Sequence, residues 1–502
     1  MGGSRYNRAM LLDQAQYYEA LRTHDPRFDG LVFVGVGTTG IYCRTVCTAR
    51  TPLQKNCTFY PSAAAAERAG YRPCLRCRPE LAPGRAPIDA FSRTGALIAA
   101  RLEGGALSGA TVSELASELG LSPRHLRRIV QSEFGVSPIE LAQTQRLHTA
   151  LRLLSETALP ITEIAFASGF SSVRRFNALF CERYHQNPSD YRNRPTISPR
   201  QDTGAVRCTL SYRPPFDWRS LLRFLGARAI PGVERVTIAD DTQTGQYFRT
   251  ARINQYCGWI SVTHREEYRC LVVEISHSLA PVMQKLLARL RRLFDLHAEP
   301  EQIARHLGEL AARNPGLRVP GCFDSFELAI RAVCGQQITV RGATTIIGRI
   351  ASLAGSTLEG VPSPTSLAET ETCPQLIWPR AEQLASFDQV ALKGCGVTAR
   401  RADTLIALSE AIASGEIRLE PGVDIEQTTK ELKRINGIGE WTAQYIAMRA
   451  LSWPDAFPHS DLAIMKALGV TNTRASLELA ELWRPWRSYA AMHLWRSLET
   501  NP

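Results

Sequence analysis

The chain has 502 residues, of which 44% are hydrophobic and 21% charged, and these values indicate a globular protein of several domains. No apolar run reaches the roughly 18 to 20 residues of a membrane span, and the charged first 30 residues argue against a secretion signal. We therefore expect a cytoplasmic protein without a membrane partner, in which persistent disulfides are rare. The net charge is +11, and residues 1–200 hold 25 Lys and Arg against 16 Asp and Glu. This bias favours nucleic acid as partner, although a solvated basic surface would also explain it.

Stretches rich in proline and glycine divide the chain into four expected units. The breaks lie at 79–87, 192–207 and 314–321, and helical and extended patterns alternate around them. The units that follow are 1–80, 85–195, 207–300 and 301–502.

The first unit holds two close pairs of cysteines. Cys43 and Cys47 form a C-x3-C pair, and Cys74 and Cys77 form a C-x2-C pair. Two such pairs predict a tetrahedral zinc site, because each pair bends around one ion and the fold joins the pairs. Buried thiols or two disulfides are the alternatives, and the compartment disfavours disulfides. The remaining cysteine of this unit, Cys57, is expected to pack in the core.

The stretch FVGVGTTGIYCRTVC…YRPCLRCRPE (33–80) closely resembles the N-terminal domain of Ada-type DNA methylphosphotriester repair proteins. The resemblance implies a small zinc-bound α/β domain with one structural and thiolate-activating Zn²⁺ on the four cysteines. It also implies that Cys43 accepts a methyl group from an alkylated DNA phosphate. The positions that it places near the DNA backbone are Thr39, Arg50 and Arg72.

The chemistry of such a site is physically reasonable. A thiolate is the nucleophile, and zinc keeps it deprotonated at neutral pH. Four thiolates outweigh the charge of one Zn²⁺ and repel an ordinary phosphate, whereas a methylated phosphate is neutral. Methylation of Cys43 removes one negative charge, so DNA affinity should then rise. The expected centre is therefore a single-use acceptor and a switch, and a purely structural zinc is the alternative.

Two segments predict helix-turn-helix units, at 111–138 and 160–192. In the first, Gly120 makes the turn and Ser122 caps the next helix; in the second, Gly169 makes the turn and one of the two following serines caps. A linking helix of about 20 residues spans about 30 Å, close to one turn of B-DNA. A three-helix packing module with a basic surface is the alternative. The side chains expected to point outward from the second helices are Arg124, His125, Arg128, Val173, Arg174 and Asn177.

These units resemble the AraC-type DNA-binding domain, including the GFSS turn and the NPSDYR ending. Ada-type activators join it to the zinc domain in the same order. The resemblance implies an all-α, double helix-turn-helix domain that binds promoter DNA, with RNA polymerase as a further expected partner.

A hairpin carrying two glycines, Gly437 and Gly439, lies in LKRINGIGEWTAQY far downstream. Glycines there let backbone N–H groups approach a DNA phosphate, and a tight turn between core helices is the alternative. Asp461 follows at the expected start of a helix, where it could simply be an N-cap. Aromatic surfaces come from Trp441, Tyr445 and Trp495, which could equally be core residues.

Three stretches, FDSFELAIRAVCGQQ, NGIGEWTAQY and WRPWRSYAAMHLW, resemble the helix-hairpin-helix DNA glycosylases of the AlkA type over about 207–500. The resemblance implies a β-rich, TBP-like subdomain followed by an α-helical glycosylase domain. It makes Asp461 the catalytic carboxylate that stabilises positive charge on the sugar. Trp441, Tyr445 and Trp495 become the pocket for the flipped, alkylated base.

Departures from the related families narrow the expected chemistry. Gln336 and Gln337 stand at the DNA-facing loop, and Gln337 matches an apolar wedge, so the wedge is polar or absent. Trp441 replaces the lysine of related lyases, which favours a monofunctional hydrolase. No cysteine follows Cys395, so an iron–sulfur motif is missing, and no PCHR motif for O6-methylguanine repair is present.

The sequence as a whole predicts a multidomain α+β protein of the bacterial cytoplasm and nucleoid, acting as a monomer on double-stranded DNA, both alkylated and promoter DNA. We expect it to demethylate phosphotriesters at Cys43, to activate transcription and to excise bases such as 3-methyladenine through Asp461. The main alternative is a transcription regulator whose C-terminal half binds DNA without catalysis.

Overall fold

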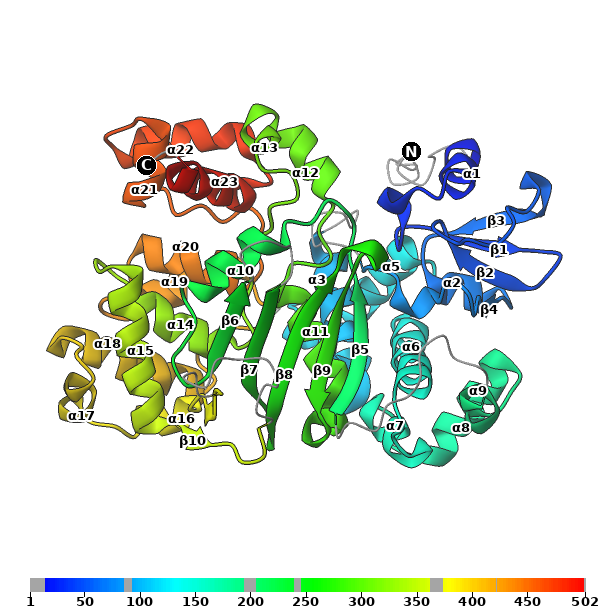
Figure 1. Ribbon diagram of the computed structural model, residues 1–502, viewed down its shortest axis with the longest axis horizontal. Coiled ribbons are helices and arrows are strands. Elements are labelled where there is room, and N and C mark those ends of the chain that lie inside the picture. Colours follow the sequence, from blue (N-terminus) through cyan, green and yellow to red (C-terminus); the bar gives the residue numbers. More distant parts are fainter. Residues whose placement is uncertain are drawn as a thin grey trace.

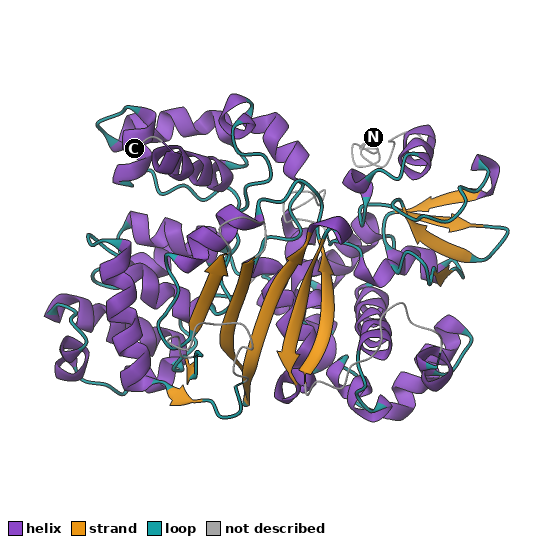
Figure 2. Cartoon of the chain, in the orientation of Figure 1, coloured by secondary structure: helices purple, strands orange, loops and turns teal. Residues whose placement is uncertain are grey.

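The computed structural model describes residues 14–84, 93–193, 205–238, 245–361, 373–420 and 422–500. It confirms a multidomain α+β architecture: a five-stranded sheet occupies the middle, a small sheet lies on the N-terminal side, and helices of the C-terminal half lie on the other side (Figures 1 and 2). Within the described ranges, no helix has the length and apolar character needed to cross a membrane.

The small sheet carries the first cysteine pair at its open end. Its strand order is β3(Cys57–Tyr60)-β1(Phe33–Val36)-β2(Ile41–Arg44)-β4(Arg72–Pro73), and only the β2–β4 pair is parallel. The helix α2(Ala63–Arg68) packs on it, and α1(Gln14–Arg22) precedes it. The parallel β2–β4 pair places Ile41 and Tyr42, just before Cys43, beside Arg72 and Pro73, just before Cys74.

Both helix-turn-helix units form as predicted, after a first helix α3(Arg93–Glu103). The first unit is α4(Val112–Glu118) and α5(Pro123–Phe134), and the second is α7(Ile161–Ala167) and α8(Val173–Tyr184). Gly120 and Gly169 adopt positive φ in the two turns, and Ser122 and Ser172 cap the second helices. The linking helix α6(Pro138–Glu156) has 19 residues, which is about 28 Å. A short helix, α9(Pro188–Arg192), ends the domain.

The central sheet is entirely antiparallel. Its order is β5(Ala205–Ser211)-β9(Cys270–Ser276)-β8(Tyr256–Arg265)-β7(Gly245–Ile253)-β6(Glu234–Ile238). The helices α10(Trp218–Gly226) and α11(Met283–Leu293) contribute their apolar faces to its core. That core continues into the second helix-turn-helix unit, because Phe176 and Phe180 belong to the same buried cluster as the strands.

The C-terminal helices form two groups (Figure 1). The lower group runs from α14(Ser325–Cys334) and α15(Val340–Ala354), through α16(Ala381–Ala385), α17(Gln389–Gly394) and α18(Ala399–Ala413), to α19(Ile425–Arg434) and α20(Glu440–Arg449). The upper group contains α12(Pro300–Leu307), α13(Glu309–Ala312), α21(Leu462–Leu468), α22(Thr473–Ala480) and α23(Arg487–Thr500). A small ribbon, β10(Ser356–Thr357) with β11(Leu376–Ile377), also lies in this half.

A buried arginine ties the front and rear of the protein together. Arg213 follows strand β5, and its guanidinium donates to the carbonyl oxygens of Asp29, Gly84 and His297 at 3.0, 2.6 and 2.8 Å. Arg318 in turn donates to the carbonyl of Arg213 at 2.7 Å. One side chain thus joins the zinc-binding unit, the chain that follows it and the C-terminal half.

A second connection crosses from α3 to α11. Arg291 donates to Glu103 at 2.6 Å, and His297 Nε2 lies 3.6 Å from the same carboxylate. Burial raises the pKa of Glu103, but the charges of His297 and Arg291 outweigh this and lower it to about 2. A carboxyl whose pKa is depressed on folding stabilises the fold above its unfolded pKa, and this contribution is lost as pH falls towards the folded value.

We therefore expect Glu103→Gln to lower the unfolding temperature at pH 7 by several degrees, since each kcal/mol lost corresponds to roughly 2–4 °C. The gap between wild type and variant should close as the pH falls from about 4.5 towards 2, because the wild-type carboxyl is then protonated too. Calorimetry across this pH range measures the difference in unfolding temperature between the two proteins. Glu118→Gln, at a more exposed ion pair with Arg101, is the control and should change little. A gap that persists at low pH would contradict the assignment.

Candidate functional site

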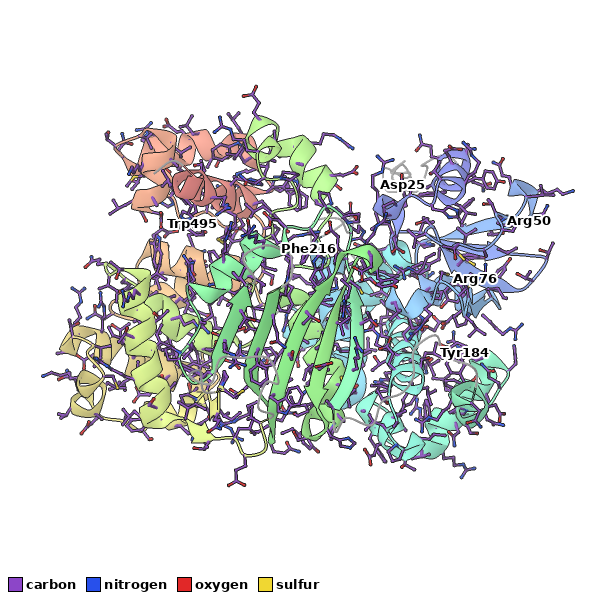
Figure 3. The ribbon with its side chains drawn as sticks, viewed as in Figure 1. Asp25, Arg50, Arg76, Tyr184, Phe216 and Trp495 are labelled. Carbon is purple, nitrogen blue, oxygen red and sulfur yellow. The ribbon has the colours of Figure 1, made fainter. Side chains whose placement is uncertain are left out.

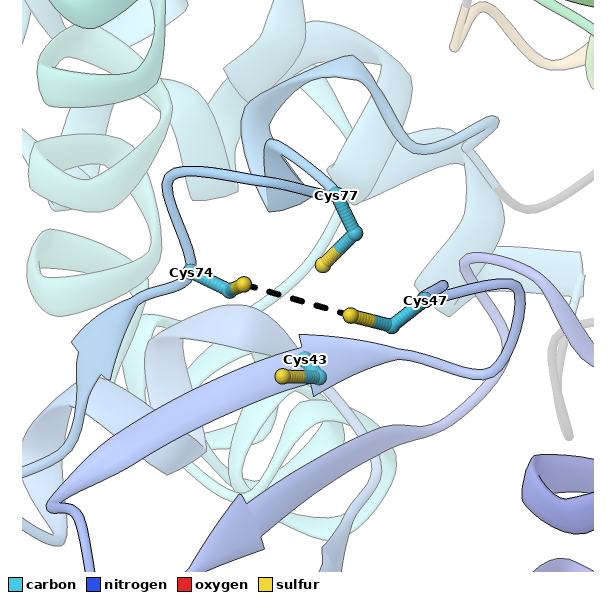
Figure 4. A group of neighbouring side chains, drawn as sticks. All are labelled: Cys43, Cys47, Cys74 and Cys77. Carbon is cyan, nitrogen blue, oxygen red and sulfur yellow. Dashed lines mark hydrogen bonds between the residues drawn. The ribbon is translucent and has the colours of Figure 1, made fainter. Parts of the chain in front are cut away.

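The four predicted cysteine ligands come together at the open end of the small sheet (Figure 4). Cys43 lies on β2, Cys47 follows it, Cys74 follows β4, and Cys77 lies in the next turn. All four Sγ atoms lie within 4.8 Å of one another, and Cys47 Sγ is 4.0 Å from Cys74 Sγ. The thirteen cysteines of the chain are all free thiols, so neither pair is a disulfide.

This geometry fits zinc. Tetrahedral coordination with Zn–S bonds of about 2.3 Å places the sulfurs roughly 3.8 Å apart, within the observed spread. A set of four thiolates selects Zn²⁺ or an iron–sulfur centre and disfavours hard cations such as Mg²⁺. Cys47 and Cys74 are buried, whereas Cys43 and Cys77 are half-buried, so an incoming group can reach part of the cluster. The chain holds one structural zinc at this cluster.

Cys57 does not belong to this cluster, and the expectation that it packs in the core is wrong. It begins the edge strand β3 and is half-buried, with its Sγ donating to the carbonyl of Leu53 at 3.5 Å. Edge strands expose alternate side chains to solvent, which explains its position.

Removal of a ligand should therefore abolish metal binding. We expect Cys47→Ala to lose the zinc that wild type carries at one ion per chain, because three sulfurs no longer close the tetrahedron. The zinc-binding unit should also unfold at lower temperature, since metal binding contributes to folding free energy. Elemental analysis of purified protein measures the first effect and calorimetry the second. Cys57→Ala, at the thiol outside the cluster, should keep its zinc; equal metal content in the two variants would refute the ligand set.

Buried charges surround the cluster and connect it to its neighbours. The Arg44 backbone N–H donates to Cys77 Sγ at 3.4 Å, and its guanidinium forms a buried ion pair with Asp29. Since the carbonyl of Asp29 accepts from Arg213, three contacts in series connect the cluster to the rear of the protein.

The residue before Cys43 is tied to the helix-turn-helix domain. The buried Tyr42 hydroxyl donates to Glu67 on α2 at 2.9 Å, and the same carboxylate accepts from Thr144 on α6 and Tyr184 on α8. Burial raises the pKa of Glu67, but its contacts with His148 and the other donors hold the pKa below its usual range. The carboxylate therefore joins three elements in its charged form.

The three residues expected near the DNA backbone are all exposed. Thr39 lies in the β1–β2 turn, Arg72 on β4 and Arg50 in the loop after Cys47. Figure 3 places Arg50 at the outer end of the zinc-binding unit and Arg76 beside the sheet. Arg76 was not predicted; it is exposed in the turn between the second pair of ligands and donates to the carbonyl of Thr48.

The recognition helices present their predicted side chains, with one exception. Val173 was expected to point outward but packs against the central core, because it is the first residue of α8 and lies beside the turn. The others are exposed to solvent: Arg124, His125, Arg128, Arg174 and Asn177.

The candidate catalytic carboxylate lies where the two groups of C-terminal helices meet. Asp461 caps α21, and its Oδ1 accepts from the backbone N–H groups of Ala463 and Ile464 at 3.0 Å each. Its Oδ2 accepts from Trp441 Nε1 at 2.8 Å, and its Oδ1 also accepts from Trp495 Nε1 at 3.1 Å. Trp441 comes from α20 in the lower group. Trp495 comes from α23 in the upper group (Figure 3). Asp461 is an N-cap, as the alternative interpretation predicted. Its carboxylate also accepts hydrogen bonds from two indole N–H groups.

The third aromatic residue completes a cluster of rings beside this carboxylate. Tyr445 stacks on Trp441 with centroids 5.1 Å apart, and its ring lies 6.4 Å from that of Trp495. Arg449, one turn further along α20, donates to the Tyr445 hydroxyl at 2.7 Å. Burial raises the pKa of Tyr445, but the charges of Arg449 and Arg228 outweigh this and lower it.

The structure constrains the two hairpin glycines, Gly437 and Gly439, differently. Gly437 has a φ of +97°, and a Cβ there would lie 2.2 Å from the Thr404 hydroxyl oxygen. Gly439 caps α20 in an extended conformation, and nothing lies within 4 Å of the Cβ it lacks. The fold requires the first glycine, whereas the second leaves open space in front of the N-terminus of α20.

The two glutamines also differ. Gln336 is half-buried, and its Nε2 donates to the carbonyl of Gly437 and to Thr442 Oγ1, both at 2.8 Å. It therefore holds the α14–α15 loop against the hairpin. Gln337 is exposed and has a φ of +54°.

Sequence reasoning missed several of these contacts. Arg449 carried a detectable signal, because it stands four residues after Tyr445 on one helix and such residues face each other. Arg213, Glu67 and Asp29 carried none, because each has a partner in another domain.

Comparison with known proteins agrees with this arrangement. Three family models match: the metal binding domain of Ada at residues 16–80, a helix-turn-helix domain at 115–194 and the AlkA N-terminal domain at 207–324. The chain is 37% identical over 501 residues to a "probable bifunctional transcriptional activator/DNA repair enzyme AlkA" of Mycobacterium tuberculosis, covering 97% of each chain.

Two relatives from Escherichia coli each match one part of the chain. "DNA-3-methyladenine glycosylase 2" is 36% identical over 287 residues, covering 57% of this chain and 96% of that protein. "Bifunctional transcriptional activator/DNA repair enzyme Ada" is 31% identical over 172 residues, covering 34% of this chain and 47% of that protein. The chain is thus similar over nearly its whole length to the Mycobacterium tuberculosis protein, and over separate parts to the two Escherichia coli proteins.

Proposed function

The chain belongs to the family of bifunctional transcriptional activators and DNA repair enzymes that the AlkA protein of Mycobacterium tuberculosis represents, and from this premise we propose three linked activities. It accepts methyl groups from DNA phosphotriesters, it binds promoter DNA as an activator, and it hydrolyses the N-glycosidic bond of alkylated bases. The proposed units are 1–80, 85–195, 207–300 and 301–502.

Methyl transfer takes place at Cys43, which is half-buried, as is Cys77, and which lies on the β2 strand. A Zn²⁺ on Cys43, Cys47, Cys74 and Cys77 supplies the positive charge that keeps the sulfurs deprotonated. Cys43 Sγ donates an electron pair to the methyl carbon, and an S–C bond forms as the C–O bond breaks. The phosphate leaves with that electron pair as an ordinary anionic diester, so no proton has to move. Thr39, Arg50 and Arg72 contact the neighbouring backbone.

Base excision takes place at Asp461. The base is flipped out of the duplex at a cost of a few kcal/mol and lies against Trp441, Tyr445 and Trp495. When the C1′–N bond breaks, the electron pair leaves with the base and positive charge develops on the sugar, which the carboxylate stabilises. Water then adds at C1′ and loses its proton to the carboxylate. Since Trp441 stands where a lyase has lysine, the product is an intact abasic strand.

Promoter binding uses the exposed side chains of α5 and α8 in successive major grooves. Methylation of Cys43 removes a negative charge from the front of the protein and strengthens its attraction to DNA. RNA polymerase is the proposed partner of the activated form, which acts as a monomer.

One observation carries the repair function: Asp461 is held by four N–H groups, two of them indoles from opposite groups of helices. A carboxylate that only caps a helix has no need of two aromatic donors. The test is incubation of wild-type protein with dimethyl sulfate-treated duplex DNA. Chromatography should find free methylated purine, and strands should break only after alkali. Absence of released base would refute the glycosylase function.

A further inference from the structure

A cavity of about 600 Å³ lies where the four proposed units of the protein meet. Phe33 of the small sheet lines it, and so do the helices α3, α6 and α11, of which α3 contacts the other two (Figure 1). The C-terminal half contributes Met448 on α20 and Trp453 after it. Cavities of roughly 300–1,000 Å³ hold small organic molecules in other proteins. A molecule in this cavity would contact all four units.

The wall of the cavity is mostly apolar, and small side chains form part of it. Ala99 and Ala100 of α3 and Ala288 of α11 leave the space that larger residues would fill. Such a wall binds an apolar group by removing it from water, and it offers that group few hydrogen bonds. The polar side chains of the wall therefore decide which head group an occupant carries.

The carboxylates in the wall already have donors of their own. Each accepts a hydrogen bond from a neighbouring arginine or tyrosine at 2.6 to 2.8 Å, and the pairs are Glu80 with Arg78, Glu103 with Arg291, Asp295 with Tyr489, and Asp455 with Arg487. Because these oxygens are engaged inside the protein, they do not call for a cationic occupant.

Two arginines in the wall have no anionic partner within the described residues. Arg152 is 3% exposed and donates to the carbonyl of Glu80 at 2.8 Å, but its Nε has no hydrogen-bond partner there. The Arg292 guanidinium makes neither a hydrogen bond nor an ion pair with the described part of the chain. Burial and the nearby charge of Arg291 lower the pKa of Arg152 to about 10, and burial also lowers the pKa of Arg292. A buried cation without a counter-charge is costly, so both side chains favour a negatively charged neighbour.

We propose that this cavity binds an organic anion with an apolar body, whose charged head meets Arg152 and Arg292. The head supplies the counter-charge that the wall lacks, and the body covers apolar surface. A nucleotide fits less well, because its base and sugar would place polar groups against alanines and against carboxylates that already have donors. Neither Cys43 nor Asp461 lines the cavity, so its occupancy is a property separate from both repair activities.

The test uses 1-anilinonaphthalene-8-sulfonate, an anion with an apolar body that fluoresces in apolar surroundings. We expect the zinc-loaded, full-length protein to bind one probe per chain, and decanoate to displace it. Decanol, which lacks the charge, and deoxyadenosine monophosphate, which lacks the apolar body, should each displace it at least tenfold more weakly. Decanoate should also raise the unfolding temperature, since a ligand that binds only the folded state stabilises it.

Variants separate the charge of the site from its shape. The double variant Arg152→Met with Arg292→Met keeps the apolar stems and should weaken binding of probe and decanoate at least tenfold. Ala100→Phe keeps both arginines but fills the space, and the same loss is expected. Arg223→Met is the matched control, because Arg223 is exposed on α10 outside the cavity, and it should bind as wild type does. Circular dichroism and zinc content check the fold of each variant.

The proposal fails if the wild-type protein does not bind the probe, or if the double variant and Ala100→Phe both bind it as Arg223→Met does. It also fails if decanol or deoxyadenosine monophosphate displaces the probe as well as decanoate does, because the charge or the apolar body would then not be recognised. If the double variant does not fold, Ala100→Phe decides the question, since it changes no charge.

Discussion

Replacement of Asp461 by asparagine is expected to lower base release about a hundredfold to a thousandfold, the usual effect of losing one preorganised electrostatic contact to a transition state. Positive charge develops on the sugar as the C1′–N bond breaks, and the amide offers no negative charge to meet it. The fold should survive, because asparagine caps helices as well as aspartate does and can still accept from Ala463 and Ile464. Single-turnover chromatography of released purines measures the rate, and circular dichroism checks the fold.

The control for this variant is Asp424→Asn. Asp424 caps α19 and accepts from the Gln427 backbone N–H, so it shares the capping role of Asp461, but no indole of the described residues donates to it. It should release base at the wild-type rate. If both variants are equally active, Asp461 is a helix cap and the C-terminal half only binds DNA. If both are equally slow, the loss comes from the caps and not from the carboxylate.

The local parts of the fold could be predicted from sequence because their signals are local. In the first helix-turn-helix unit, the Ser122 side chain caps α5 by accepting from the backbone N–H of His125, three residues later. Gly120 forms the preceding turn through its positive φ. The cysteine pairs are equally self-contained, since C-x3-C and C-x2-C each bend around one ion. Only the approach of one cysteine pair to the other depends on the tertiary fold, and the parallel pairing of β2 with β4 brings the two pairs together.

The contacts between domains could not be predicted, because nothing near a residue in sequence specifies a partner two hundred residues away. Arg213 looked like any surface arginine, yet it is fully buried and donates to carbonyls from three separate segments. The same holds at the candidate catalytic site. Trp441, Asp461 and Trp495 were each singled out, but their hydrogen bonds depend on how α20 and α23 pack around α21.

Packing also decided the smaller errors. Val173 was assigned to the outer face of its helix by its place in the helical pattern, and Cys57 was assigned to the core as the cysteine outside the two pairs. The first turn of α8 lies against the central core, which buries part of Val173, while Cys57 lies on an edge strand that leaves it half-buried. A pattern states which side chains share a face, and only the neighbouring domains determine whether that face is buried.

These connections affect how the two repair sites relate. The cluster reaches Asp29 through Arg44, and the carbonyl of Asp29 accepts from Arg213, which also donates to His297 in the C-terminal half. Glu67 makes a similar link between the strand of Cys43 and α6 and α8. The front of the protein therefore packs on the rear through buried charges, and it is not held by the chain alone.

Replacement of Cys43 by serine is expected to abolish methyl transfer to the protein. A serine hydroxyl stays protonated at neutral pH and is a poor nucleophile, whereas the sulfur of Cys43 is presented half-buried at the edge of the cluster. After incubation of wild type with DNA carrying methylphosphotriesters, peptide mass spectrometry should find one added methyl group, on the peptide that contains Cys43. The serine variant should carry none on any cysteine.

The assignment depends on which thiol is modified and not on loss of function alone, because Cys43→Ser also removes a metal ligand. Peptide mass spectrometry of the methylated wild-type protein identifies the modified thiol directly, since it needs no variant. Cys57→Ser, at the half-buried thiol outside the cluster, should accept methyl as fast as wild type. A methyl group on Cys47, Cys74 or Cys77 would move the acceptor to another ligand. An unmethylated wild-type protein that retains its zinc would leave the metal a purely structural role, and the electrostatic switch at the front of the molecule would then not exist.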